Sequence, residues 1–167
     1  MPDKDDKERE DKRNALRGEL DIRALLKVTK LKEIMTSKVV SIQVDSPFSE
    51  VPKKFNMHNI RHLPVVGEKN KLVGLMTQRD LYKLHSPRKL EDGSWYYDED
   101  ELNSYILKDV MLQDPLAMGA EDCVGDAVLE MVRNKYGCIL IIDQNEALCG
   151  IVTRVDILKM AAQIYSS

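Results

Sequence analysis

Two seven-residue stretches of the chain share a leading glycine, a threonine and an aspartate three positions after the threonine. They are Gly74-Leu75-Met76-Thr77-Gln78-Arg79-Asp80 and Gly150-Ile151-Val152-Thr153-Arg154-Val155-Asp156. This pattern after an apolar run is typical of a helix N-terminus, where the hydroxyl caps a backbone N–H and the carboxylate lies at the positive end of the helix dipole. The free N–H groups of a helix start also attract phosphate, and an ionised carboxylate accepts hydrogen bonds from vicinal hydroxyls. One copy is a weak signal, but two copies in register predict the same helix start twice.

The flanking residues predict that each stretch closes a unit of strand, helix, two strands and helix. In the first unit we expect strands at 39–42, 63–66 and 71–76, a middle helix running toward Asn59, and a closing helix at 80–84. The middle helix has two possible starts. Ser46 before Pro47 is one, but it leaves Pro52 inside the helix, whereas a cap at Ser49 places Pro52 in the first turn. In the second unit we expect strands at 116–118, 138–142 and 147–152 and a helix at 122–134.

Residues 31–84 can be laid over residues 107–160 without a gap, which identifies an internal repeat. The identical positions are Leu31, Lys32, Met35, Leu72, Gly74, Thr77, Asp80 and Lys83, matching Leu107, Lys108, Met111, Leu148, Gly150, Thr153, Asp156 and Lys159. The chain therefore divides into a charged arm and lead-in helix (1–30), a first repeat (31–84), an acidic connecting loop and helix (85–106) and a second repeat (107–167). Residues 139–142 are all apolar, as expected of a strand covered on both faces, so the repeats are expected to share their buried sheets.

The segments outside the repeats have distinct compositions. Residues 3–13 are all charged and predict a solvent-exposed arm, whereas residues 14–28 have apolar residues at helical spacing and predict a lead-in helix. The connecting loop holds an acidic run and the sequence Trp95-Tyr96-Tyr97, and we expect a helix at 98–106. We interpret the aromatic residues as anchoring the loop to the body, with a binding patch as the alternative.

The bulk composition excludes several classes of protein. With 43% apolar residues, 32% charged residues and a net charge of −3, the chain is typical of soluble globular proteins. It is not basic enough to indicate nucleic-acid binding, and no apolar run approaches the roughly 18 residues of a membrane span. Three cysteines without a C-x-x-C pair, and an amino terminus unlike a secretory leader, lead us to expect reduced thiols in the cytoplasm.

Three phrases of the first repeat, with their counterparts in the second, resemble a pair of cystathionine β-synthase (CBS) domains, the Bateman module. The phrases are Ile34-Met35-Thr36-Ser37-Lys38-Val39-Val40, Asn59-Ile60-Arg61-His62-Leu63-Pro64-Val65-Val66 and the stretch from Gly74 to Asp80. The resemblance covers residues 31–164 apart from the connecting loop. It implies an α+β fold of the α/β type, in which two βαββα units pack sheet to sheet about a pseudo-twofold axis with two clefts between them.

In that family the clefts bind adenosine nucleotides, and two modules often associate into a flat disc. The resemblance implies an adenine nucleotide as ligand, with AMP as the first candidate and ADP, ATP, S-adenosylmethionine and NAD as the others, and a homodimer of four repeats. It assigns the ribose to the aspartates and the phosphate to the threonine hydroxyls and nearby basic groups, while the strand-entry segments line the base pocket. The expected ligand-binding residues are Thr36, Val39, Ile60, Arg61, His62, Pro64, Thr77, Arg79, Asp80, Leu112, Pro115, Tyr136, Gly137, Thr153, Arg154 and Asp156.

The two copies differ beside their helix starts. Arg61, His62 and Pro64 of the first copy become Gly137, Cys138 and Leu140 in the second, which removes two groups able to neutralise phosphate. Arg154 in turn follows its threonine directly, at the position of Gln78 in the first copy. We therefore expect unequal clefts, one tight and one weak or empty.

Other chemistry finds less support. His58 and His62 have the spacing of metal ligands on a helix, but no cysteine or carboxylate in that phrase completes a site, so no metal is expected. Cys123, Cys138 and Cys149 lie in apolar surroundings typical of inert buried thiols. No catalytic grouping is identified, so we do not expect an enzyme. Two functions remain: a sensor that signals nucleotide binding to an unidentified partner protein, and a structural or interaction protein with degenerate clefts that acts through dimer assembly.

Overall fold

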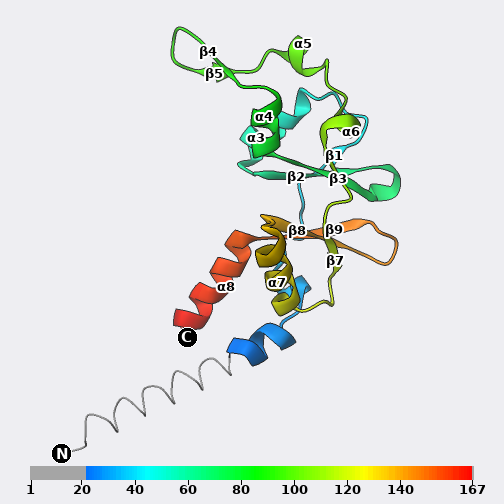
Figure 1. The fold of residues 1–167 in the computed structure, drawn as a ribbon, viewed down its shortest axis with the longest axis vertical. Coiled ribbons are helices and arrows are strands. Elements are labelled where there is room, and N and C mark those ends of the chain that lie inside the picture. Colours follow the sequence, from blue (N-terminus) through cyan, green and yellow to red (C-terminus); the bar gives the residue numbers. More distant parts are fainter. Residues whose placement is uncertain (1–21, 167) are drawn as a thin grey trace, which may run out of the picture.

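The computed structural model describes residues 22–166 of the chain as two stacked halves. Each half is a small sheet with helices on its outer side, and the two sheets face each other in the middle of an elongated molecule (Figure 1). The predicted charged arm and the first part of the predicted lead-in helix lie outside the described residues. The remainder of that helix is present at residues 22–28.

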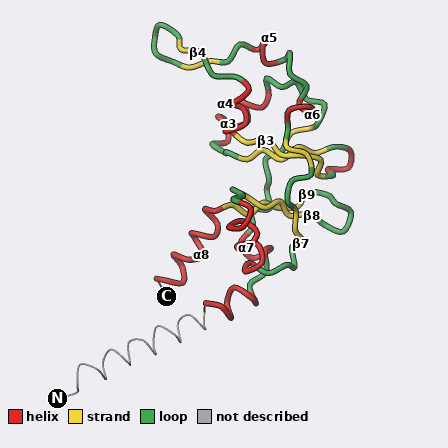
Figure 2. Tube along the Cα trace, in the orientation of Figure 1, coloured by secondary structure: helices red, strands yellow, loops and turns green. Residues whose placement is uncertain are grey.

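The first half has a four-stranded sheet in the order β1-β2-β3-β6. Strand β1 (Ile42–Gln43) is parallel to β2 (His62–Val66), and β2 is antiparallel to β3 (Leu72–Thr77). The short helical turn η1 (Glu68–Asn70) joins β2 to β3. Helices α3 (Glu50–His58) and α4 (Gln78–Leu84) cover the outer face of this sheet (Figure 2).

The second half repeats this order with a three-stranded sheet, β7-β8-β9. Strand β7 (Ala117–Gly119) is parallel to β8 (Cys138–Ile142), and β8 is antiparallel to β9 (Leu148–Thr153). Its helices are α7 (Val124–Asn134) and α8 (Arg154–Ser166). The repeat seen in the sequence is therefore a repeat of structure.

The central strands are buried on both faces because each sheet packs on helices on one side and on the other sheet on the other side. In β8, Ile139 and Ile141 belong to the core beneath α7 and α8, whereas Cys138 and Leu140 belong to a separate cluster between the sheets. Val66 and Leu75 of the first half complete that middle cluster. The expectation that the halves share buried sheets is confirmed.

The leading segment of each repeat packs in the opposite half. Helix α2 (Leu31–Ile34) opens the first repeat, yet Leu31 is fully buried in the core of the second half. Conversely, α6 (Leu107–Val110) and β6 (Leu112–Gln113) open the second repeat, and β6 pairs with β3 of the first half. The equivalent pairing in the other direction is an isolated bridge between Thr36 and Ile151 of β9.

Two sequence expectations are corrected. Residues 39–42 were predicted as a strand, but only Ile42 and Gln43 form β1, because residues 37–41 cross from the sheet of the second half to that of the first. Residues 98–106 were predicted as one helix, but α5 (Glu99–Leu102) ends after about one turn, since Asn103 and Ser104 favour a turn over a helix interior. The alternative N-cap at Ser49 is confirmed, and Pro52 lies in the first turn of α3.

The rest of the connecting loop forms a hairpin. Strands β4 (Arg88–Lys89) and β5 (Trp95–Tyr96) pair antiparallel and project beyond the first half (Figure 1). The interpretation of the aromatic residues as anchors holds for Tyr97, which packs against the core of the first half. It is wrong for Trp95, whose surface is 64% exposed.

Candidate functional site

The first helix start is capped by its threonine. Thr77 ends β3 and is the N-cap of α4, and its Oγ1 accepts a hydrogen bond from the backbone N–H of Asp80 at 3.1 Å. The same hydroxyl donates to Asp80 Oδ2 at 2.5 Å. The other oxygen, Asp80 Oδ1, lies 3.6 Å from Lys83 Nζ, and the carboxylate side chain is 34% exposed. A carboxylate oxygen and an ammonium group are thus presented together at the helix start.

The second helix start uses the same residues in a different way. Asp156 Oδ2 accepts hydrogen bonds from both the backbone N–H and the hydroxyl of Thr153, each at 2.8 Å. Asp156 Oδ1 lies 3.9 Å from Lys159 Nζ, and the side chain is only 12% exposed. The second carboxylate is therefore more enclosed and one of its oxygens accepts two hydrogen bonds.

The exchanged leading segments bring each helix start next to the opposite repeat. Thr36 exchanges two backbone hydrogen bonds with Ile151, two residues before Thr153. In the same way Leu112 pairs with Leu75, two residues before Thr77. Of the predicted strand-entry residues, Thr36 and Leu112 therefore lie beside the helix starts, but each one accompanies the threonine and aspartate of the other repeat.

His62 lies where the two halves meet. It pairs with Thr77 across β2 and β3, and its Nε2 would be 2.5 Å from a Cβ atom placed on Gly137. Burial lowers the pKa of His62, and the positive charges of Arg154 and Arg61 lower it further, while Asp80 acts in the opposite direction. The absence of a side chain at Gly137 leaves room for the imidazole of His62. The residues that differ between the two copies are therefore sterically complementary to each other.

Arg154 is used as a helix cap in this structure. Its Nε donates to the carbonyl of Tyr136 and its Nη2 to the carbonyl of Lys135, both at 3.1 Å. Lys135 is the left-handed C-cap of α7, so the guanidinium satisfies carbonyls at the end of that helix. Arg61, the basic residue of the first repeat at the same junction, is exposed, and its carbonyl accepts the N–H of Gln78 at 3.0 Å.

The remaining predicted residues vary in exposure. Pro64 is buried within β2, Val39, Ile60 and Pro115 are half-buried, and Arg79 and Leu112 are exposed. Val39 packs against the cluster between the sheets, whereas Ile60 packs against the core of the first half. Among the described residues, no group of three or more His, Cys, Asp or Glu side chains is arranged to hold a metal ion.

Two methionines and two glycines contribute to the site but were not among the predicted site residues, although all four are identities of the repeat. A Cβ atom on Gly74 would lie 2.3 Å from Met111 Sδ, and one on Gly150 would lie 2.3 Å from Met35 Sδ. Each glycine thus admits the methionine of the opposite repeat's leading segment, and this contact fixes that segment beside the helix start. Lys83 and Lys159 were also identical in the alignment, and their pairing with the aspartates gives that identity a physical reason.

Two cavities in the described part of the chain lie elsewhere. One, of about 500 Å³, lies between the hairpin and helices α3 and α4, and none of the predicted ligand-binding residues lines it. The other, of about 220 Å³, is an apolar groove between the lead-in helix, α7 and α8. No described helix is long and apolar enough to cross a membrane.

Comparison with known proteins gives a consistent result. The family model for the CBS domain matches residues 31–86 and 107–162. An uncharacterised 17.7 kDa protein of Acidianus ambivalens is 28% identical over 83% of this chain and 76% of its own length. An inosine-5'-monophosphate dehydrogenase of Methanocaldococcus jannaschii is 30% identical over 79% of this chain, but the match spans only 23% of that enzyme.

Solved structures agree with these relatives. The CBS domain of a CBS-domain-containing membrane protein from Sphaerobacter thermophilus is 27% identical, with a TM-score of 0.70, and the match covers 87% of this chain and 95% of that one. CBSX2, solved in complex with AMP, matches at 21% identity and a TM-score of 0.67 over 81% of this chain and 98% of its own. The domain pair of protein MJ0100, solved with 5'-methylthioadenosine and S-adenosyl-L-methionine, matches at 23% and 0.67, over 81% and 98% of the two chains. The last two likenesses concern the fold alone.

Proposed function

Because the chain belongs to the CBS-domain family and contains a pair of these domains, we propose that it is a non-enzymatic regulatory protein that binds an adenosine-containing nucleotide between its repeats. The observation that carries the proposal is the repeated arrangement of a carboxylate, a lysine and a helix N-terminus beside the leading segment of the opposite repeat. A carboxylate oxygen suits the two hydroxyls of a ribose, and the lysine and the helix N–H groups suit a phosphate. A nucleotide bound there contacts both halves and shifts the equilibrium between their relative arrangements. A partner protein that binds these arrangements with different affinities then responds to the nucleotide.

The first helix start is the better candidate for the tight site. Asp80 is more exposed than Asp156. Oδ2 of Asp80 accepts one hydrogen bond, from the hydroxyl of Thr77, whereas Oδ2 of Asp156 accepts two, from the hydroxyl and the backbone N–H of Thr153. Arg61 and His62 stand at the same junction, and neither guanidinium nor imidazole has an equivalent in the second repeat. The second site would have to release Arg154 from the end of α7 before using it.

The nucleotide is proposed from the relatives. CBSX2 was solved with AMP, and the MJ0100 domain pair with two sulfur-containing adenosine compounds. The shared adenosine suggests that the base and ribose are the recognised part, so AMP is the first candidate, followed by ADP, ATP, S-adenosylmethionine and NAD. The phosphate partners at the first helix start favour a nucleotide over an uncharged nucleoside.

Calorimetric titration with AMP tests the proposal. Asp80→Asn is expected to weaken the tight site about tenfold or more, because hydrogen bonds to a charged carboxylate contribute about 1.5–3 kcal/mol. Asp156→Asn is expected to change only the weaker site. The matched control is Asp45→Asn, which removes the same charge from an exposed turn and should leave binding unchanged.

Thermal melting provides the second readout. A ligand at 100 times its dissociation constant adds about 2.7 kcal/mol of stability, so the melting temperature of the wild type should rise clearly with the preferred nucleotide. If no adenosine compound shifts the melting temperature, or if Asp80→Asn lowers stability without affecting affinity, the aspartates act only as helix caps and the proposal fails. Two equal sites per chain would contradict the inequality of the clefts.

Assembly is the second candidate function, and one observation favours it. Large apolar side chains are exposed on the helices of both halves, namely Met57, Leu129, Val132, Val155 and Leu158. Such faces suit a homodimer in which four repeats form a disc, which we propose as the working assembly. Sedimentation of the protein with and without nucleotide separates a dimer that senses a ligand from one that is purely structural. The regulated partner is a separate protein in the cytoplasm on this proposal, with neither nucleic acid nor membrane involved.

A further inference from the structure

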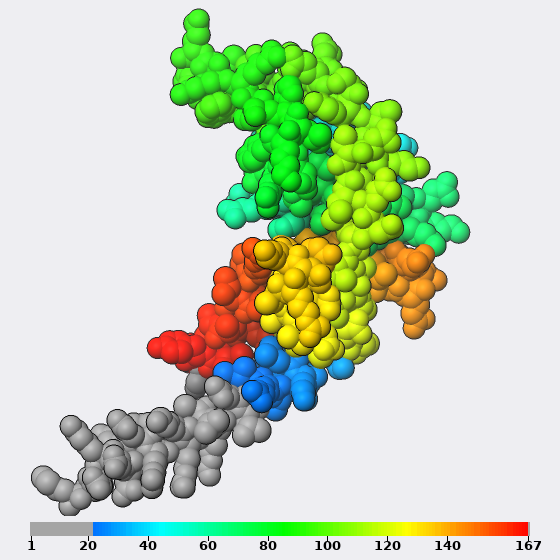
Figure 3. Space-filling view, viewed as in Figure 1, coloured from blue at the N-terminus to red at the C-terminus, as the bar shows by residue number. Residues whose placement is uncertain are grey.

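The connecting hairpin borders an open cavity that none of the residues of the proposed nucleotide sites lines. The cavity has a volume of about 500 Å³ and lies between β5, α5, α3 and α4, a space we call the hairpin pocket. Its size falls within the roughly 300–1,000 Å³ of typical ligand pockets. In the space-filling view the hairpin stands out from the first half, so the pocket is reached without passing the junction of the two halves (Figure 3).

The walls of the hairpin pocket are rich in rings. They include Tyr82, Trp95, Tyr96 and Tyr97, together with Pro52 and Pro87. Trp95 is 64% exposed and Tyr82 is 50% exposed. Tryptophan and tyrosine rings have large apolar surfaces whose exposure to water is unfavourable. They are the residues that most often anchor a protein interface. Grooves lined by aromatic rings are also typical of sites for extended, proline-containing peptides.

The connecting loop that forms the hairpin carries a negative surplus. Residues 85–106 contain six acidic and two basic side chains. Arg88 pairs with Glu101 and Asp98, and Lys53, which faces the hairpin from α3, pairs with Glu99 at 2.8 Å. The Lys89 ammonium lies 5.7 Å from the centre of the Trp95 ring. Among the described ion pairs of the loop, Glu91, Asp92 and Asp100 are therefore the acidic side chains that no basic group neutralises. The Lys89 contact also demonstrates that a cation is accommodated on the Trp95 ring.

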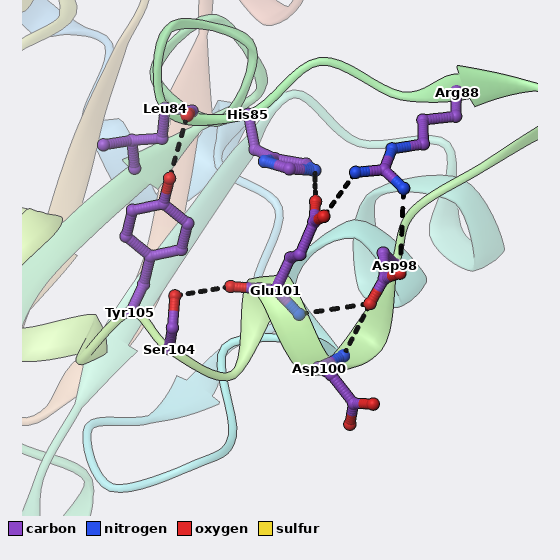
Figure 4. A network of polar contacts seen from close by, with 8 residues as sticks. All are labelled: Leu84, His85, Arg88, Asp98, Asp100, Glu101, Ser104 and Tyr105. Carbon is purple, nitrogen blue, oxygen red and sulfur yellow. Dashed lines mark hydrogen bonds and ion pairs between the residues drawn. The ribbon is translucent and has the colours of Figure 1, made fainter.

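The hairpin is held in place by a network of polar contacts at its base (Figure 4). Glu101 is bonded to Arg88, and its other oxygen lies 3.2 Å from His85 Nε2, an ion pair when the imidazole is protonated. Asp98 caps α5 by accepting the N–H groups of Asp100 and Glu101. Tyr105 donates to the carbonyl of Leu84 at the end of α4. These contacts preorganise the pocket, which lowers the entropic cost of binding.

We propose that the hairpin pocket is the docking site for an extended basic segment of a partner protein. Apolar or proline side chains of that segment lie on the rings of the pocket, and its arginine or lysine side chains meet the acidic side chains of the connecting loop. Charge complementarity selects this occupant over an acidic peptide or a nucleic acid. The pocket also contains Gln78, the first residue of α4, whose N-cap is Thr77. The docking site would be the output of a nucleotide sensor if α4 contacts both the nucleotide and the docked segment. This part of the inference rests on the proposed function.

The test begins with a phage-displayed library of short random peptides, selected on the full chain in the absence of nucleotide. We expect enriched peptides that contain arginine or lysine together with proline or aromatic residues. Because Trp95 is the only tryptophan of the chain, binding of these peptides should change the intrinsic fluorescence. No enrichment, enrichment of acidic peptides, or enriched peptides that leave the Trp95 fluorescence unchanged would each overturn the proposal.

Variants then locate the site by anisotropy of a labelled enriched peptide. Trp95→Ala and Tyr96→Ala should each weaken binding about tenfold or more, as expected of interface anchors, while Trp95→Phe retains most of it. Asp100→Lys, at an exposed position of α5, should weaken binding without touching the rings. The matched control is Tyr165→Ala, at an exposed tyrosine of α8 outside the pocket. Equal binding to the Trp95→Ala and wild-type chains, both shown to be folded by circular dichroism, would overturn the proposal.

Measurements without nucleotide separate this proposal from the previous one. The wild-type chain should bind the enriched peptide when no nucleotide is present, and calorimetric titration of the same preparation measures the binding of AMP. If the protein binds peptide but no nucleotide, the docking site stands and only its role as a sensor output fails. If Trp95→Ala instead abolishes self-association of the chain, the pocket belongs to a second copy and the proposed occupant is wrong.

Discussion

The two helix starts have the same three residues and different hydrogen bonds. At the first, the Thr77 hydroxyl caps the helix and also holds the Asp80 carboxylate. At the second, the Asp156 carboxylate reaches back to both donors of Thr153. The comparison teaches that identical residues in a repeat do not guarantee equal binding capacity, because the neighbours decide which atoms remain available to a ligand.

The residues around the two helix starts also differ, and they too leave more polar groups available at the first helix start. Arg154 closes the C-terminal end of α7, whereas Arg61 makes no side-chain contact of that kind among the described interactions. His62 stands at the junction in the first repeat, and its counterpart Cys138 is a buried thiol whose pKa is raised to about 12 by burial. The basic groups that remain available at the junction, Arg61 and His62, therefore belong to the first half, whereas Arg154 of the second half is engaged by α7.

The largest expected effect on stability concerns the contact between a glycine and a methionine, which both halves have in common. Gly74→Ala and Gly150→Ala should each lower the free energy of unfolding by about 1–3 kcal/mol, because the new methyl group overlaps Met111 or Met35. Gly150→Ala should be at least as severe, since Ile141 Cβ is also only 3.2 Å from the new atom. Urea denaturation measures both. The control is Gly67→Ala, where the nearest atom is 3.4 Å away and little change is expected.

The next effect distinguishes the two modes of capping. Thr77→Val should destabilise the fold by about 1 kcal/mol, because it removes the acceptor for the Asp80 N–H. Thr153→Val should cost less than half as much, since the Asp156 carboxylate still accepts the backbone N–H of residue 153. Thermal unfolding of both variants gives the comparison. Equal losses would mean that the two helix starts are capped alike.

The arginines should separate stability from binding. Arg154→Gln is expected to lower the free energy of unfolding by about 0.5–1 kcal/mol, because two exposed hydrogen bonds at the end of α7 are lost. Arg61→Gln should leave stability unchanged and weaken AMP binding severalfold. A variant of Arg61 that unfolds at lower denaturant, with unchanged AMP affinity, would reverse the roles assigned to these residues.

The smallest effect is the dependence of stability on pH. The folded state lowers the pKa of His62, so as pH falls below about 6.5 the unfolded chain takes up protons more readily and stability is lost. His62→Gln should reduce this loss, as seen in melting temperatures over a pH series. Cys138 at the equivalent position should contribute nothing in this range, because burial raises the pKa of its thiol. An identical pH profile in the variant would show that His62 does not titrate with folding.

Local sequence patterns predicted the elements that depend on neighbours in the chain. The cap at Thr77 was predicted because side-chain capping acts over three residues, and the start of α3 after Ser49 was predicted because Pro52 is tolerated only in the first turn. Strand β8 was predicted at its true bounds because its apolar run has sharp ends. The strand at 39–42 failed for the opposite reason. Its residues have strand propensity, but a strand requires a partner, and most of this segment crosses between two sheets.

The arrangement of the candidate site depended on contacts that propensity does not record. Met35, Met111, Gly74 and Gly150 were all visible as identities in the repeat, yet nothing local shows that each glycine faces the methionine of the other copy. The hairpin and its pocket were missed because only one segment of the chain encodes them, so no second copy was available for comparison. The acidic composition of that segment indicated exposure and said nothing of its geometry.

The exchanged leading segments make each half incomplete without the other. A fragment ending before residue 107 would lack Leu107 and Met111 from the core of its own sheet, and it would expose Leu31 with no core to enter. Such a fragment satisfies its contacts only by trading its leading segment with a second identical fragment. The tandem duplication therefore does within one polypeptide what two single units would have to do as an intertwined pair, and it keeps both partners at a fixed ratio.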